Sequence, residues 1–205
     1  WFSSDVKETY SDSIFSALRC VFRRRTWRQA IAFFAAGIED QANGIFWPLF
    51  LFLLALSYSS LGFLISISLV ITLAVSYIIG RLSDRVGFKK VMNIGVALHA
   101  LSWVGRIFVA SPGAAYAAHS FYGFSRAAAA VPFSAIFYDN VASAAGKSYC
   151  AVVLCEQALD LGKMLFLAGA GLFFLFSKNF DAIFLFVAIT ALCMWFLRLE
   201  TKHKH

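Results

Sequence analysis

Residues 80–90 read Gly-Arg-Leu-Ser-Asp-Arg-Val-Gly-Phe-Lys-Lys and lie between two long apolar runs. Four cationic side chains, one carboxylate and two glycines share this short segment. Glycine allows backbone conformations that other residues rarely adopt, so the segment predicts a tight turn between two helices. Cations concentrated in such a turn are typical of one side of a membrane.

The composition of the 205-residue chain favours a membrane protein. Hydrophobic residues make up 60% of the sequence and charged residues only 14%. Soluble domains carry about 45–50% apolar and about 25% charged residues. A soluble core of this size would not bury so much apolar surface, so we expect lipid to be the solvent. The four cysteines show no metal-binding spacing, and we expect them to be small packing residues.

Six apolar runs are each long enough for a transmembrane helix, which takes about 20 residues. They cover approximately residues 27–56, 61–80, 91–110, 114–137, 149–176 and 180–197. We therefore predict an all-α, polytopic integral membrane protein with a six-helix bundle over residues 27–198. Residues 1–26 are expected to form a cytoplasmic amphipathic and basic linker, and residues 199–205 a cytoplasmic tail.

Lys and Arg residues are distributed unequally between the two ends of these spans. Only Lys178 lies in a connection on one side. On the other side lie Lys7, Arg19, Arg23, Arg24, Arg25, Arg28, Arg81, Arg85, Lys89, Lys90, Lys147, Arg198, Lys202 and Lys204. Because cytoplasmic loops carry the excess of Lys and Arg, both termini are predicted to lie in the cytoplasm, with the bundle in the cell or inner membrane. The formal charge of +7 thus indicates topology, and no nucleic-acid partner is expected.

The segment before the first span has helical periodicity. Its apolar residues Ile14, Phe15, Leu18, Val21 and Phe22 fall on one helical face. Three arginines end the segment, where cations suit a helix C-terminus. We predict a short amphipathic helix on the inner leaflet, and the alternative is a poorly ordered basic tail.

The segment 80–90 resembles the signature loop of the major facilitator superfamily, whose pattern is G-x-L-x-D-R-x-G-x-K/R-K/R. Seven residues match this pattern: Gly80, Leu82, Asp84, Arg85, Gly87, Lys89 and Lys90. The segment also lies where the family has it, between the second and third helices of a six-helix half. The resemblance implies one half of a twelve-helix bundle, with the missing six-helix half as a partner.

The basic lead-in resembles the linker between the two halves, which favours the C-terminal half; the N-terminal half is the alternative. The first residue is Trp1 rather than Met, so we expect a piece of a longer protein. In the family, the Asp and Arg of the signature loop brace helix ends during the transport cycle. That role would fall to Asp84 and Arg85, with Asp139 as a candidate partner of the arginine. The other reading is that these charges only enforce topology.

Seven ionisable side chains lie well inside the predicted spans, where charge is costly and usually functional. They are Glu39, Asp40, Arg106, Arg126, Glu156, Asp160 and Lys163. At about 1.5 Å per helical residue, five of them lie about 17–21 Å along their spans, near the bilayer midplane. Secondary transporters bind substrates and coupling ions at that level, so we expect a substrate and coupling cavity there.

Helical spacing extends this set. Glu156, Asp160 and Lys163 are separated by four and three residues, so they share one face of the fifth span. Asn43 follows the acidic pair of the first span by about one turn, and His119 shares a stripe with the arginine of the fourth span. The predicted cavity residues are therefore Glu39, Asp40, Asn43, His119, Arg126, Glu156, Asp160 and Lys163.

These charges have two readings that the sequence leaves open. They could form buried ion pairs that only hold the bundle together, such as Arg126 with Asp160 or Lys163 with Glu39. Alternatively they could bind a solute and a proton. Four acids stand against three bases. The surplus carboxylate, Glu156 or Asp160, is a candidate proton site because burial favours the protonated form.

Two further polar residues are expected to lie outside this cavity. Arg106 lies about one turn from the outer end of the third span, so we expect its guanidinium to reach the headgroups. His99 lies on the same helical face and is expected to be a packing residue with satisfied hydrogen bonds.

The leading hypothesis is half of a secondary transporter that moves a small polar solute by alternating access, as a symporter or an antiporter, coupled to protons. The alternative is a non-transporting scaffold or sensor that keeps the fold and uses the charges as structural ion pairs. The sequence contains no HExxH, GxSxG or Walker-type P-loop, so neither an enzyme nor an ATP-driven pump is expected. No cofactor or metal is expected either.

Overall fold

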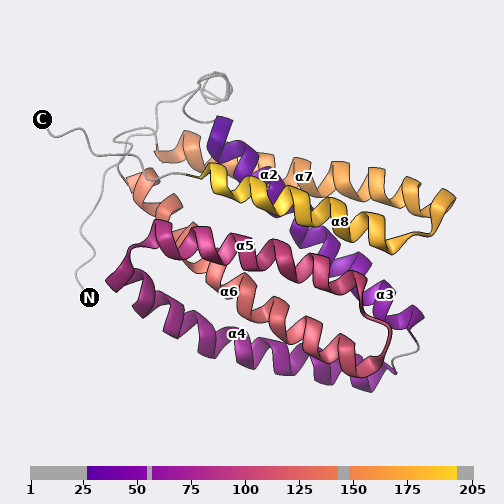
Figure 1. Cartoon of the computed structure of the whole chain (residues 1–205). Coiled ribbons are helices and arrows are strands. Elements are labelled where there is room, and N and C mark those ends of the chain that lie inside the picture. Colours follow the sequence, from indigo (N-terminus) through magenta and orange to yellow (C-terminus); the bar gives the residue numbers. More distant parts are fainter. Residues whose placement is uncertain (1–26, 55–56, 143–147, 198–205) are drawn as a thin grey trace, which may run out of the picture.

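The computed structural model describes residues 27–54, 57–142 and 148–197, and all regular structure in these ranges is helical (Figure 1). The predicted amphipathic helix at 11–25 and the tail at 199–205 lie outside the described residues. The elements are α2 (Trp27–Gln41), η1 (Ala42–Phe46), α3 (Trp47–Leu53), α4 (Tyr58–Val86), α5 (Phe88–Ile107), α6 (Pro112–Ala142), α7 (Ser148–Ser177), α8 (Phe180–Ala191) and η2 (Leu192–Phe196). The all-α class predicted from the sequence is confirmed.

The first helical rod is interrupted in its middle. The α-helix α2 passes into a π-helical segment, η1, and continues as the α-helix α3. Pro48 lies in the first turn of α3, and it has no N–H to donate to a carbonyl of the preceding η1 segment. The proline ring excludes the carbonyl four residues earlier from regular helical bonding, which gives a local reason for the π segment. Such π segments are frequent at functional sites.

The segment 80–90 is not a loop. Helix α4 continues through its charged residues to Val86, and α5 begins at Phe88. The reversal takes place at one residue, Gly87, whose φ of +99° lies in a region that favours glycine. Gly80 is an ordinary helical residue with open space around it. The expectation of a turn across the whole segment is therefore wrong, because charged residues at a helix end can remain helical.

Polar caps set the helix starts at the opposite end of the molecule. The hydroxyl of Ser57 accepts a hydrogen bond from the backbone N–H of Ser60 at the start of α4. The side-chain oxygen of Asn179 accepts from the N–H groups of Asp181 and Ala182 at the start of α8. These caps satisfy N–H groups that lack an intrahelical partner, so the helices can begin sharply.

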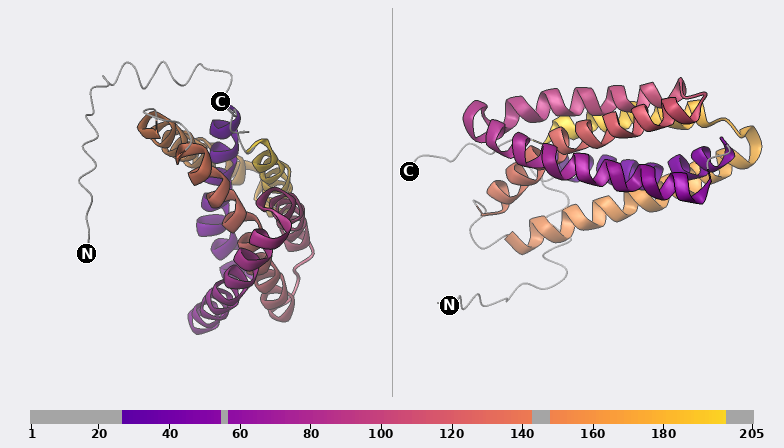
Figure 2. Two further views of the ribbon diagram at one scale, coloured as in Figure 1. Left: turned by 90° about the vertical axis from the view of Figure 1, so that its left-hand side faces the viewer. Right: turned by 90° about the horizontal axis from the view of Figure 1, so that it is seen from below.

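The long helices are aligned along one axis of the molecule (Figures 1 and 2). Helix α6 packs against both α4 and α5, α7 packs against α2, and α8 packs against α5. The bundle therefore contains two closely packed pairs, α2 with α7 and α5 with α6. The middle of the first rod reaches across to α5 and α6 through its side chains, as the next subsection describes.

Glycines bring these pairs into backbone contact. A Cβ atom on Gly162 of α7 would lie 2.2 Å from the carbonyl oxygen of Phe34 on α2. A Cβ on Gly37 of α2 would lie 2.0 Å from the carbonyl oxygen of Leu159 on α7. On α5, Gly95 has the same relation to α6. Small residues at helix crossings are typical of bundles in which lipid supplies no hydrophobic driving force.

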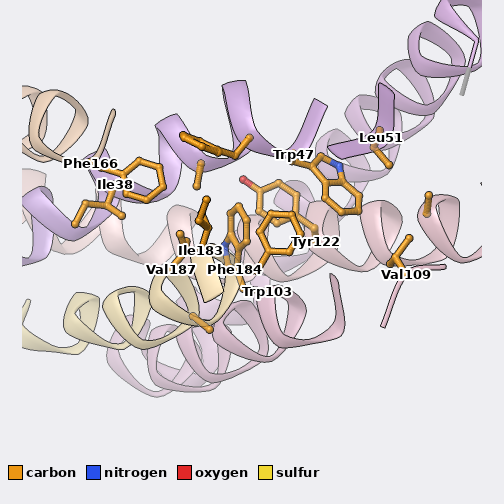
Figure 3. Packing of buried hydrophobic residues seen from close by; sticks show 14 of the residues in the cluster. Ile38, Trp47, Leu51, Trp103, Val109, Tyr122, Phe166, Ile183, Phe184 and Val187 are labelled. Atoms are coloured by element: carbon orange, nitrogen blue, oxygen red, sulfur yellow. The ribbon is translucent and has the colours of Figure 1, made fainter. Parts of the chain in front are cut away.

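The core at the middle of the first rod is aromatic. Trp47, Trp103, Tyr122 and Phe184 converge from α3, α5, α6 and α8 (Figure 3). The ring of Trp103 is edge-on to Tyr122, with centroids 5.8 Å apart, and also contacts Phe184. Edge-to-face pairs of this kind stabilise a core beyond the area that they bury.

Many large apolar side chains remain exposed on the outside of the bundle. Within the described residues, two helices are long and apolar enough to cross a membrane by length and composition, Tyr58–Val86 and Ala151–Ser177. Only 17% of each apolar window is buried inside the protein. Helix α8 and η2 together form a shorter apolar helix, Phe180–Phe196.

Candidate functional site

A cavity of about 260 Å³ opens between α2, α6 and α7. Most of its lining is apolar, with Phe33, Phe133 and Phe137 among the contributors. Its ionisable lining residues are Glu39, Asp40, His99, Arg126, Tyr138 and Glu156. The structure therefore brings four of the eight predicted cavity residues around one space and adds His99, which the sequence analysis placed elsewhere.

Asp40 and Arg126 form the open pair of this cavity. An Nη of Arg126 donates to Oδ1 of Asp40 over 2.8 Å, and the two side chains are 41% and 38% exposed. The bond links α2 to α6, and these two helices belong to different packed pairs. A partly exposed ion pair can exchange one partner for a charged group of a solute at lower cost than a fully buried one.

Glu39 lies next to Asp40 but is buried, with 4% of its surface exposed. The hydroxyl of Tyr122 donates a hydrogen bond to its Oε1. Nε2 of His99 lies 3.5 Å from the same oxygen. Consecutive helical residues point about 100° apart, so one acid faces the cavity while its neighbour faces the protein interior.

Arg106 is the largest departure from the sequence-based expectation. Its guanidinium does not reach the surface: the residue is fully buried, with 0% exposure. The guanidinium carbon lies 4.2 Å from the ring centroid of Trp47 and 4.0 Å from those of Trp103 and Tyr122. Its Nη2 donates to Oδ1 of Asn43 over 2.9 Å.

The prediction for Arg106 failed because the first rod and α6 cover the end of α5. Arginine can reach the headgroups only along an open path, and here aromatic rings close that path. Arginine stacked on aromatic rings gains cation–π attraction that grows when water is excluded. A tryptophan one turn before the arginine was the available signal in the sequence, but it does not reveal which other helices supply rings.

His119, another predicted cavity residue, belongs to this aromatic cluster and not to the cavity lining. Its Nδ1 accepts a hydrogen bond from Nε1 of Trp47 over 2.9 Å, and the two rings are stacked. Asn43 accepts a hydrogen bond from the buried guanidinium of Arg106. Both residues thus hold the buried cluster beside the cavity, and neither lines it.

The charged stripe of α7 is divided between two environments. Glu156 lines the cavity, whereas Asp160 and Lys163 bond to each other over 3.3 Å on the helix surface. The Asp160 side chain is 68% exposed. The suggested pairs Arg126–Asp160 and Lys163–Glu39 do not form, because Arg126 bonds to Asp40 across the cavity and Glu39 faces Tyr122 and His99.

The residues of the signature segment lie at the far end of α4 and the start of α5. Asp84, Arg85 and Lys90 are exposed, and Lys89 is half-buried. Asp139 lies near the end of α6 and is also exposed. The pairing of Arg85 with Asp139 stays a prediction.

A bundle of apolar-surfaced helices around a charged internal cavity is an architecture of polytopic membrane transport proteins. A sequence profile of the Major Facilitator Superfamily matches residues 30–205. The chain therefore belongs to the Major Facilitator Superfamily, a family of integral membrane transporters. A comparison with curated proteins finds no match.

Proposed function

We propose that the chain is one six-span half, the C-terminal one, of a secondary transporter with both termini in the cytoplasm. The transporter moves a small polar solute by alternating access. The half-length of the chain and its basic lead-in support this assignment, as does the excess of Lys and Arg on one side of the spans. The second half and the solute would complete the site.

The observation that carries the proposal is the Asp40–Arg126 pair in the cavity. Both side chains are partly open to the space, and they present one negative and one positive group at 2.8 Å from each other. A solute with an anionic and a cationic group, or an anion alone, can displace one partner of such a pair. A solute that has both groups would leave neither charge unpaired in the bound state, which keeps the cost of desolvation low; an anion alone would leave Asp40 without its partner.

Proton coupling is the finer part of the proposal. Carboxylates at the bilayer midplane are the groups we expect to exchange protons with the cavity, and Glu39, Asp40 and Glu156 all lie along it. Asp84 and Arg85, at the end of α4, are proposed to contact helix ends when the two halves change orientation. The transporter is a symporter if the proton and the solute cross the membrane in the same direction, and an antiporter if they cross in opposite directions.

Thiol accessibility tests the proposed transport cavity. We would place single cysteines at Asp40, Arg126 and Glu156 in the full-length protein, on a background in which the native cysteines are replaced. Membrane-impermeant charged thiol reagents should modify all three positions from one side of the membrane. A cysteine at Leu172, an exposed apolar position on α7 that lines neither pocket, is the control and should stay unmodified because these reagents do not enter lipid.

The outcome separates the two hypotheses. A transporter exposes the cavity to water on one side at a time, so a bound solute should change the rate of modification. A scaffold with structural ion pairs would leave all three cysteines unmodified from both sides. That result would move the assignment from transport to a structural role.

A further inference from the structure

Among the seven ionisable groups that lie well inside the spans, the carboxylates outnumber the cations by one. Asp40 bonds to Arg126, and Asp160 bonds to Lys163, so these four groups cancel. Of the remaining three, Glu39 and Arg106 are buried, whereas Glu156 is exposed on the cavity wall. His99 lies 3.5 Å from Glu39 and lines the same cavity as Glu156. A proton on His99 would balance the charge of the carboxylates around this cavity.

The hydrogen bonds of His99 provide an acceptor for each of its two ring nitrogens. Nε2 faces the carboxylate of Glu39, and Nδ1 lies 3.4 Å from Oγ of Ser125. The hydroxyl of Ser125 donates its proton to the carbonyl oxygen of Tyr122 over the shorter distance of 3.0 Å. A serine hydroxyl has one proton to donate, so its lone pair faces Nδ1. An imidazole between two acceptors matches the doubly protonated, cationic form.

His119 offers an internal contrast on the neighbouring helix. Its Nδ1 accepts the indole N–H of Trp47 over 2.9 Å. An indole nitrogen only donates, so Nδ1 of His119 carries no proton, and the ring is neutral. Both histidines are buried, with 1% and 6% exposure, so burial alone does not distinguish them. Their hydrogen-bond partners do.

Glu39 is held as the anion in this arrangement. Its Oε1 accepts from the hydroxyl of Tyr122, whose ring lies against the guanidinium of Arg106 at 4.0 Å. Arginine keeps its charge in proteins, so a positive charge stands permanently behind the tyrosine. A proton that enters this cluster from the cavity therefore binds to His99 and not to Glu39.

We infer that His99, in place of the cavity carboxylates proposed above, carries the coupling proton of the transport cycle, paired with the ionised carboxylate of Glu39. In the releasing step, the N–H bond at one ring nitrogen breaks and the proton passes to cavity water. The electron pair stays on the nitrogen, His99 becomes neutral, and Glu39 remains a carboxylate. Uptake from the other side of the membrane reverses the step. This inference rests on the proposed transport function.

The groups around His99 decide how easily the proton leaves. The ionisable side chains that face it come from every neighbouring element that carries them: Glu39 and Asp40 on α2, Tyr122 and Arg126 on α6, Glu156 on α7 and Arg106 on its own helix. The described part of α8 after Asp181 has no charged residue. A cationic solute group near Asp40 or Glu156 would repel the proton, which couples binding to release.

Nitrogen-15 NMR of histidine-labelled, full-length protein in lipid nanodiscs tests this directly, because protonated and bare ring nitrogens have distinct chemical shifts. We would assign the signals by replacing each of the four histidines with Asn in turn. At neutral pH, His99 should show two protonated nitrogens and His119 one. Raising the pH should remove one of these protons from His99 and leave the signals of His119 unchanged.

Single substitutions show which neighbouring groups keep His99 protonated. Glu39→Gln removes the anion, so His99 should become neutral at neutral pH; Glu156→Gln, in the same cavity but beyond contact, should have a smaller effect. Ser125→Ala removes the acceptor at Nδ1 and should lower the fraction of His99 that carries two protons at neutral pH. An unchanged His119 signal shows that each variant is folded. Ser125→Ala is the milder variant and can be read even if Glu39→Gln does not fold.

Three results would overturn the inference. They are a neutral His99 throughout the titration, a His99 that stays cationic throughout it, and a titration that Glu39→Gln leaves unchanged. Each can occur while the cavity cysteines are modified, in which case the transport function stands and the proton site is wrong. If the cysteines are not modified but His99 titrates as expected, the transport function itself fails and the imidazolium is only structural.

Discussion

Replacing Gly162 with alanine should separate α2 from α7. A Cβ at this position would lie 2.2 Å from the carbonyl oxygen of Phe34 and 3.0 Å from its carbonyl carbon. Ordinary van der Waals contact begins at about 3.4 Å, so the new methyl group is about 1.2 Å too close. The obstacle is backbone, which cannot rotate away as a side chain can. One helix must therefore shift relative to the other.

The size of the effect follows from a comparison with Gly169→Ala on the same helix. No atom lies within 4 Å of a Cβ at Gly169, so this variant gains helix propensity without a clash. Both variants exchange glycine for alanine in a helix, so the propensity gain of about 0.5–1 kcal/mol cancels in their difference. What remains is the cost of overpacking, about 1–3 kcal/mol.

Thermal unfolding of the full-length protein in detergent measures this difference. For a protein of about 150–250 residues, 1 kcal/mol corresponds to about 2–4 °C, and the shift is smaller for a longer chain. We therefore expect the apparent Tm of Gly162→Ala to lie below that of Gly169→Ala by up to about 12 °C. Gly37→Ala, whose Cβ meets a carbonyl oxygen at 2.0 Å, should behave like Gly162→Ala. Equal Tm values for Gly162→Ala and Gly169→Ala would refute the close approach of the two backbones.

Three further predictions concern the turn, the buried cation and the cavity. Gly87→Ala should destabilise the protein by about 1–2 kcal/mol because of the positive φ, whereas Gly80→Ala should be neutral or stabilising in the same unfolding assay. Arg106→Met should destabilise the protein by about 2 kcal/mol because the buried cation–π contacts with three rings are lost, and Glu39→Gln in the same chain should recover part of that loss because Glu39 bonds to the tyrosine on which Arg106 stacks; strictly additive effects would contradict the coupling. Arg126→Ala should abolish the thermal stabilisation that a panel of amino acids, sugars, carboxylates and organic cations gives the parent protein; stabilisation that survives would place the solute elsewhere.

The helical class could be predicted from the sequence because apolar runs of this length admit few other structures. The acids of the first span and Arg126 could be placed near one another by depth alone, since helical rise converts residue number into height. Depth does not reveal direction. Glu39 and Asp40 lie at nearly the same height, yet one is buried and the other faces the cavity.

Contacts between helices limited the rest of the prediction. Arg106 was expected at the surface because Trp103, on its own helix, covers only part of the guanidinium; the rest of the cover comes from Trp47 and Tyr122 on other helices. His99 was expected to be a packing residue, and its hydrogen bonds involve α2 and α6. Helical periodicity describes one face of one helix and does not identify the helix opposite it.

The π-helical segment η1 sets the rotational phase of the first rod. A π turn holds one residue more than an α turn, so the part of the rod after Phe46 is rotated relative to the part before Ala42. Each residue of an α-helix corresponds to about 100° of rotation. One residue fewer between Ala42 and Phe46 would turn Trp47 about 100° away from the Arg106 guanidinium while Glu39 kept its place. The extra residue thus keeps Glu39 bonded to Tyr122 and, two turns later, Trp47 stacked on the arginine that lies against the same tyrosine.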